Sequence, residues 1–78
     1  MSTAEKILDK MRRNARDWRI EDVMTVARKY NLLMRAEGGS HHVFGFSGIK
    51  DSVSVPAHKP IKPVYIKQFV DLVDKAKE

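Results

Sequence analysis

The sequence predicts a single α+β domain: a three-stranded antiparallel sheet with its helices packed on one face. Apolar residues recur at helical spacing near both ends of the chain and alternate with other residues in the middle. Glycines and prolines separate these regions, and 78 residues suffice for one hydrophobic core but not for two. We therefore expect one domain over residues 1–78, with the element order α-α-β-β-β-α.

The first two helices are predicted from capping signals and apolar periodicity. Ser2 and Glu5 form a capping-box pattern ahead of an apolar stripe, which favours a helix at about residues 3–13. A second and more regular stripe predicts a helix at about residues 20–30. Asn31 suits the left-handed position that ends such a helix.

Three strand-like segments follow, and a last helix closes the chain. The glycine pair at 38–39 can turn a hairpin, Pro56 ends the third segment, and Pro63 suits the first turn of a helix. The expected strands are residues 32–36, 41–46 and 52–55, and the expected last helix is about residues 63–76. Packing the helices on one face of this sheet leaves its other face available to a ligand.

Charge and composition narrow the classes of partner and site. Fifteen Lys and Arg against ten Asp and Glu give a net charge of +5, which either favours polyanionic partners such as RNA or simply keeps a small protein in solution. The lack of cysteine excludes disulfide scaffolds, zinc ribbons and cysteine nucleophiles. No signal-peptide or membrane-spanning pattern is visible, so we expect a cytoplasmic protein without a membrane partner.

The histidines are the strongest candidates for chemistry. The glycine pair leads into a strand rather than a helix, which argues against a nucleotide-binding phosphate loop. Imidazole can take a proton from a ribose hydroxyl, and neighbouring lysines can hold a phosphate. The candidates are His41, His42 and His58, with Lys50, Lys59 and Lys62.

Two other interpretations of the histidines stay open at this point. In the first, they have no chemical role and only cover a strand end and a loop. In the second, they bind a metal. His41 and His42 are adjacent on a strand and point to opposite faces, so we do not expect them to share an ion. We expect no other cofactor either.

Strand alternation divides the two adjacent histidines between the faces of the sheet. His41 shares a face with Val43, whereas His42 shares a face with Phe44 and Phe46. If the phenylalanines face the helices, His41 lies on the open face. If Val43 faces inward instead, the phenylalanines are exposed for base stacking and His42 becomes the better candidate.

Several short motifs occur together in an order typical of one protein family. The sequence resembles the HicA family of toxins from bacterial toxin–antitoxin pairs over nearly the whole chain. The segments that carry the resemblance are Gly39–Phe44, Val53–Lys59 and Ile61–Pro63, with residues 12–14 and 20–23 resembling the longer members of the family.

The resemblance implies both a fold and a function. It implies a fold like that of double-stranded-RNA-binding domains, and an mRNA interferase that cleaves RNA independently of translation. It also implies neutralisation by a HicB-type antitoxin protein. The histidine of the family follows the Gly-Ser turn, which places it at His41 in this chain, with His42 as the alternative.

On this interpretation cleavage is metal-independent, and His41 is the general base that activates a ribose 2′-hydroxyl. Gly39 and Ser40 form the turn that aims this histidine. Phosphate is held by Lys59 foremost, with Lys50 and Lys62 as further candidates, and His58 is the spare acid or base.

The chain departs from the commoner family pattern in its last helix. Many members have a basic, threonine-starting helix there, whereas residues 65–78 of this chain carry no net charge. This difference argues against RNA contacts from that helix. Two other classes of function also fit the sequence, namely a noncatalytic RNA-binding module with the same fold and a protein-interaction domain.

Overall fold

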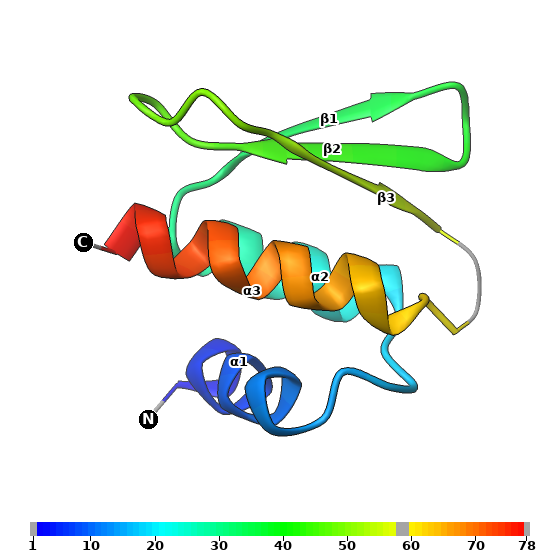
Figure 1. Cartoon of the computed structure of the whole chain (residues 1–78), viewed down its shortest axis with the longest axis vertical. Coiled ribbons are helices and arrows are strands. Elements are labelled where there is room, and N and C mark those ends of the chain that lie inside the picture. Colours follow the sequence, from blue (N-terminus) through cyan, green and yellow to red (C-terminus); the bar gives the residue numbers. More distant parts are fainter. Residues whose placement is uncertain (1, 58–59, 78) are drawn as a thin grey trace.

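A computed structural model describes residues 2–57 and 60–77 of the chain. Its three helices and three strands follow the expected order, which confirms the α+β class (Figure 1). The similarity to double-stranded-RNA-binding domains remains a prediction. The elements are α1 (Thr3–Arg13), α2 (Ile20–Lys29), β1 (Leu33–Glu37), β2 (His41–Gly45), β3 (Val53–Pro56) and α3 (Pro63–Lys77).

The helix ends follow the local signals in the sequence. The Ser2 side chain accepts a hydrogen bond from the Glu5 backbone N–H, and the Glu5 carboxylate accepts one from Ser2 in return, so the capping box is complete. Asn31 adopts a φ of 58° after α2, and this left-handed turn directs Leu32 into the core, where it is 6% exposed. Because Leu32 turns inward, β1 starts one residue later than expected.

The sheet is an antiparallel meander in the order β1-β2-β3. The turn between β1 and β2 needs two left-handed residues, and glycine supplies both, with φ of 58° at Gly38 and 75° at Gly39. This turn sets the register, in which Glu37 lies opposite His41 and Met34 lies opposite Phe44. On the other side of β2, Phe44 lies opposite Val53.

All three helices lie on one side of the sheet, as expected. Figure 1 shows α2 and α3 beneath the strands, with α1 below them on the side away from the sheet. Phe44 of β2 is fully buried and contacts Phe69 of α3 edge-to-face, with ring centroids 5.3 Å apart. Val53 and Val55 complete the strands' part of the core. None of the described helices is long and apolar enough to cross a bilayer.

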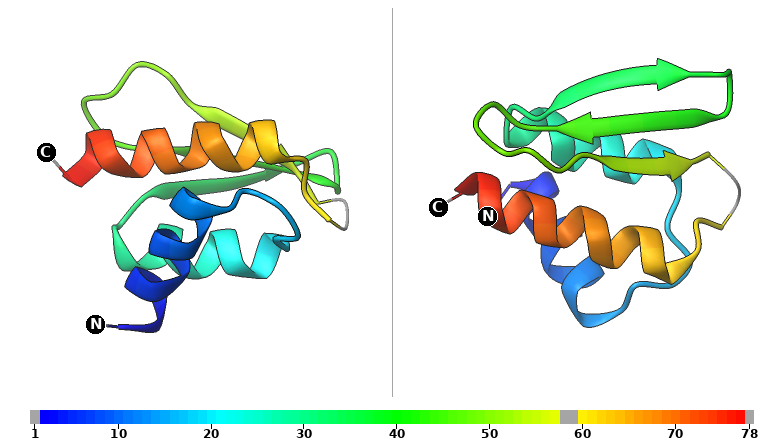
Figure 2. Two further views of the ribbon diagram at one scale, coloured as in Figure 1. Left: turned by 60° about the horizontal axis from the view of Figure 1, so that its bottom comes forward. Right: turned by 45° about the horizontal axis from the view of Figure 1, so that its top comes forward.

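The helices cover the sheet unevenly. β3 lies over α3, whereas β1 is the strand farthest from it (Figure 2, right). All five residues of β1 are exposed, including Leu33 at 63% and Met34 at 40%, whose side chains point to opposite faces. β1 is therefore an edge strand that the described part of the chain leaves uncovered on both faces.

Candidate functional site

The face of the sheet turned away from the helices is the candidate site, and we call it the open face. The register determines its members, because residues paired across an antiparallel ladder share a face. They are Leu33, Arg35 and Glu37 of β1, His41, Val43 and Gly45 of β2, and Ser54 and Pro56 of β3.

The structure decides between the two orientations of β2. Phe44 is 0% exposed beneath the sheet, so His42 lies on the helix-facing side and His41 lies on the open face. His41 is exposed, while His42 is half-buried and its Nδ1 has no hydrogen-bond partner among the described residues. The orientation with exposed phenylalanines is therefore wrong, and His41 is the histidine that a ligand on the open face can reach.

The glycine turn holds His41 at the edge of the molecule. The backbone N–H of Ser40 donates to the carbonyl of Gly38 at 2.8 Å, and the Ser40 carbonyl accepts from the N–H of Ala57 at 2.6 Å. The first bond lies within the turn, and the second ties the turn to the end of β3. The Ser40 hydroxyl also lies 3.5 Å from Nδ1 of His41, at the limit of a hydrogen bond. Gly39 and Ser40 thus lie where the sequence interpretation needs them, directly before the histidine.

Two charged neighbours of His41 were missed from the sequence. Glu37 is its direct cross-strand partner, and side chains in such pairs start about 5 Å apart. Arg35 shares the face and forms an ion pair with Glu37 at 2.6 Å. The sequence does contain a signal for the pairing of Glu37 with His41. These two residues flank the Gly-Gly-Ser turn, and a three-residue hairpin loop brings its flanking residues together.

The trio of Arg35, Glu37 and His41 offers base, carboxylate and cation within one small area. An imidazole can accept a proton, a carboxylate beside it can stabilise the imidazolium that results, and a guanidinium can oppose the charge of a phosphate. The Arg35 and Glu37 side chains are 70% and 53% exposed, so an incoming anion can reach the guanidinium from solvent.

The predicted lysines are spread over the molecule. Lys62 directly precedes α3 and lines a hollow of about 370 Å³ with Arg16 and Asp17. The start of α3 lies at the same end of the molecule as the β1–β2 turn (Figure 1). Lys50 lies in the loop after β2, at the other end of the sheet, so the structure does not bring it to His41. His58 and Lys59 lie outside the described residues.

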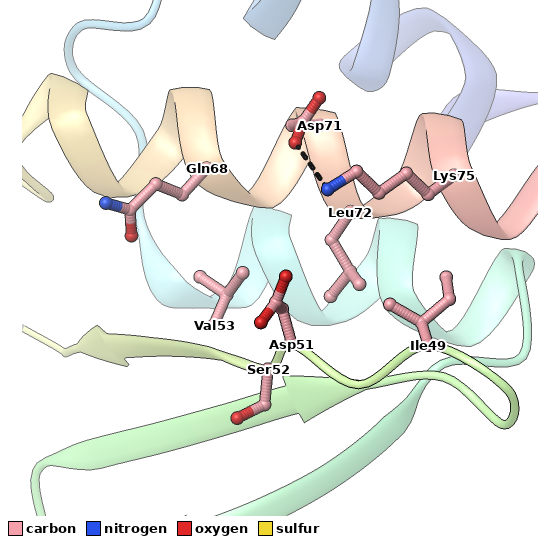
Figure 3. Close-up of a pocket in the computed structure, with 8 residues that line it drawn as sticks. All are labelled: Ile49, Asp51, Ser52, Val53, Gln68, Asp71, Leu72 and Lys75. Atoms are coloured by element: carbon pink, nitrogen blue, oxygen red, sulfur yellow. Dashed lines mark ion pairs between the residues drawn. The ribbon is translucent and has the colours of Figure 1, made fainter.

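A separate groove lies between the β2–β3 loop and α3 (Figure 3). It has a volume of about 320 Å³, and Val53 and Leu72 contribute apolar surface to it. Its charged residues are Asp51, Asp71 and Lys75, of which the last two form an ion pair at 3.3 Å across one helical turn. Its two carboxylates outnumber its one lysine, so this groove is poorly suited to a phosphate.

Three side chains with a shifted pKa, those of Arg12, Tyr30 and Asp74, lie on the helical side of the molecule. Arg12 of α1 donates two hydrogen bonds to Asp74 of α3, at 2.6 and 2.8 Å, and these bonds hold the pKa of Asp74 below its usual range. Burial raises the pKa of Tyr30 nearby. Because the Arg12 and Asp74 side chains are 44% and 39% exposed, we interpret their pair as a solvent-screened link between the two helices rather than as a catalytic group.

No family model matches this sequence, and neither a curated protein nor a solved structure shows significant similarity to it. Function is therefore inferred from the residues themselves. Within residues 2–57 and 60–77, no three or more His, Asp and Glu side chains gather where they could hold a metal ion.

Proposed function

We propose that this protein is a HicA-type toxin, an endoribonuclease that cleaves mRNA in the cytoplasm without translation and without a metal, with His41 as its general base. The observation that carries the proposal is the exposed position of His41 on the open face, opposite Glu37 and beside the glycine turn. The net charge of +5 and the sequence resemblance support the same assignment.

Each residue of the trio has a role in this reaction. His41 takes the proton of a ribose 2′-hydroxyl, and the resulting oxygen attacks the adjacent phosphorus. The bond from phosphorus to the 5′-oxygen breaks, and that oxygen receives a proton from the imidazolium or from water. The products carry a 2′,3′-cyclic phosphate and a free 5′-hydroxyl. Glu37 stabilises the imidazolium, and Arg35 opposes the charge that builds on the phosphate oxygens.

The proposal includes a protein inhibitor, a HicB-type antitoxin. His41 is exposed on an uncovered sheet face, so a partner can block the reaction by binding over it. Acidic antitoxin residues facing Arg35 and Lys62 would supply charge complementarity. We therefore expect a complex in which His41 is buried.

The test is cleavage of a purified RNA in EDTA by the wild type, His41→Ala and His42→Ala. General-base catalysis contributes about 10²–10⁴-fold, so His41→Ala should lose at least two orders of magnitude in rate. His42→Ala, purified in parallel, controls for a contaminating nuclease and should retain cleavage. Full activity in His41→Ala, with loss in His42→Ala, would overturn the assignment.

A noncatalytic RNA-binding module is the second candidate. It is favoured by the lack of a second histidine on the open face among the described residues. In that case the wild type binds RNA but leaves it intact under all conditions, and His41→Ala changes affinity alone. The same set of variants therefore separates the two candidates.

A further inference from the structure

Neither the backbone conformation nor the space at position 45 requires a glycine. The other three glycines, Gly38, Gly39 and Gly48, all have positive φ and so have a conformational reason to be glycine. Gly45 does not have positive φ, and a Cβ built there meets only the Cβ of Ser52, at an ordinary contact distance of 3.9 Å. Within a strand glycine is destabilising and often marks a place where a ligand approaches the backbone.

The missing side chain leaves a hollow on the open face. The hollow has a volume of about 300 Å³ and lies beside Leu33, the direct cross-strand partner of Gly45. Its lining residues are Leu33, Met34, Arg35, Val43, Gly45 and Ser52. Gly45 lies four residues from His41 along β2, which places the hollow about 13 Å from the histidine on the same face.

The lining suits a flat, partly polar ring. Leu33 and Val43 offer apolar surface, and Leu33 is 63% exposed, more than any other large apolar side chain identified as exposed in the described chain. Arg35 also lines the hollow, while its guanidinium is paired with Glu37. The Ser52 hydroxyl can donate to or accept from the edge of a ring.

We propose that this hollow binds one unstacked nucleobase of single-stranded RNA, a few nucleotides from the phosphate that His41 acts on. The inference rests on the proposed function, because it defines the substrate as single-stranded. A duplex keeps its bases stacked and paired, so it cannot place one in a hollow on the sheet. The net charge of +5 favours a polyanion such as RNA over a neutral or basic peptide as the occupant.

The test uses Gly45→Val, which fills the hollow with a residue that strands favour. Ala36→Val is the matched control, since it also introduces a valine at an exposed strand position, but on the opposite face of the same hairpin. Both changes are made in the His41→Ala background, and binding of a labelled single-stranded oligoribonucleotide is followed by fluorescence anisotropy. We expect Gly45→Val to weaken binding about tenfold. We expect its melting temperature to stay equal or rise, while Ala36→Val leaves binding unchanged.

Several outcomes would overturn the inference. Unchanged RNA affinity in Gly45→Val excludes the subsite, as does equal weakening of single-stranded and duplex RNA. If Gly45→Val unfolds, Gly45→Ala takes its place, and unchanged affinity there has the same meaning. If filling the hollow abolishes self-association in sedimentation and leaves RNA affinity intact, the occupant is a second copy of the chain and the inference is wrong.

Failure of this inference is distinguishable from failure of the proposed function. If His41→Ala abolishes cleavage while Gly45→Val leaves binding unchanged in that background and cleavage unchanged in the wild-type background, the ribonuclease stands and the subsite does not. If the wild type never cleaves RNA but its binding depends on Gly45, the subsite stands and catalysis does not.

Discussion

The two faces of the sheet differ in burial and in charge. On the helix-facing side, Phe44, Val53 and Val55 are at most 8% exposed and form part of the core. On the open face, Leu33 is 63% exposed and the charged pair of Arg35 and Glu37 lies in solvent. Alternate residues of β2 therefore face the core and the solvent, so stability and the proposed ligand binding should respond to different mutations.

The two edge strands differ in the same way. β3 has two of its four residues buried against the helices, whereas β1 has none buried. A long uncovered edge invites pairing with another chain, and charged residues on the edge reduce that risk. Arg35 and Glu37 provide such charges within five residues. The same pair therefore protects the edge and forms part of the candidate site.

Phe44→Ala should have the largest effect on stability. Truncating a buried phenylalanine costs about 3–5 kcal/mol, which is a large part of the stability of a domain this small. Val43→Ala, the neighbouring change on the open face, should cost less than about 1 kcal/mol. Urea unfolding followed by circular dichroism measures both. Similar losses in the two variants would mean that the faces do not differ as described.

His42→Leu should stabilise the protein, because it removes a buried ring nitrogen that has no partner among the described residues. An unsatisfied buried polar atom costs about 1–3 kcal/mol, and we expect a gain near the lower end since His42 is only half-buried. RNA cleavage should be unchanged. A loss of stability in this variant would show that His42 makes a hydrogen bond in solution.

Asp74→Asn should have a smaller and pH-dependent effect. The pKa of Asp74 is lowered by its hydrogen bonds from Arg12, so the pair stabilises the fold above the unfolded-state pKa of about 3.9. That stability is lost as pH falls through the lower folded-state pKa. The variant should be less stable than the wild type by under about 1 kcal/mol at pH 7, and the gap should close as the pH falls below the folded-state pKa. A gap that widens in acid would contradict the assignment.

Lysine substitutions should produce the smallest effects, visible mainly in the salt dependence of RNA binding. Lys62→Ala should reduce the slope of log affinity against log salt by about 0.7 if that lysine neutralises one phosphate. Lys50→Ala should do the same from the other end of the sheet. Lys6→Ala is the control, because α1 lies on the side away from the sheet (Figure 1). An equal slope change in Lys6→Ala would indicate diffuse charge rather than a site.

Most of the fold could be predicted because its signals are local. The Ser2 capping box, the left-handed Asn31 and Pro63 at the first turn of α3 all lie where the sequence predicts them. Uneven coverage of the sheet could not be predicted in this way. It depends on where the helices dock across the strands, and periodicity within β1 does not report that.

The site was predicted in part. Alternation predicted that His41 and His42 face opposite sides, but only the burial of Phe44 showed which side is open. Glu37 could have been identified from the symmetry of the hairpin turn. The hollow at Gly45 could not, because a glycine in a sequence does not reveal whether its backbone conformation requires it.

The most direct test of the central claim is to observe which face of the sheet meets RNA. Methyl-labelled His41→Ala protein is titrated with a single-stranded oligoribonucleotide, and the methyl resonances are followed by NMR. Leu33 and Val43 report on the open face, whereas Val53 and Val55 report on the helix-facing side. We expect shifts at Leu33 and Val43 that saturate with binding, and none at the two buried valines. Shifts confined to methyls of the helices, with Leu33 and Val43 unmoved, would contradict the assignment of function to the open face.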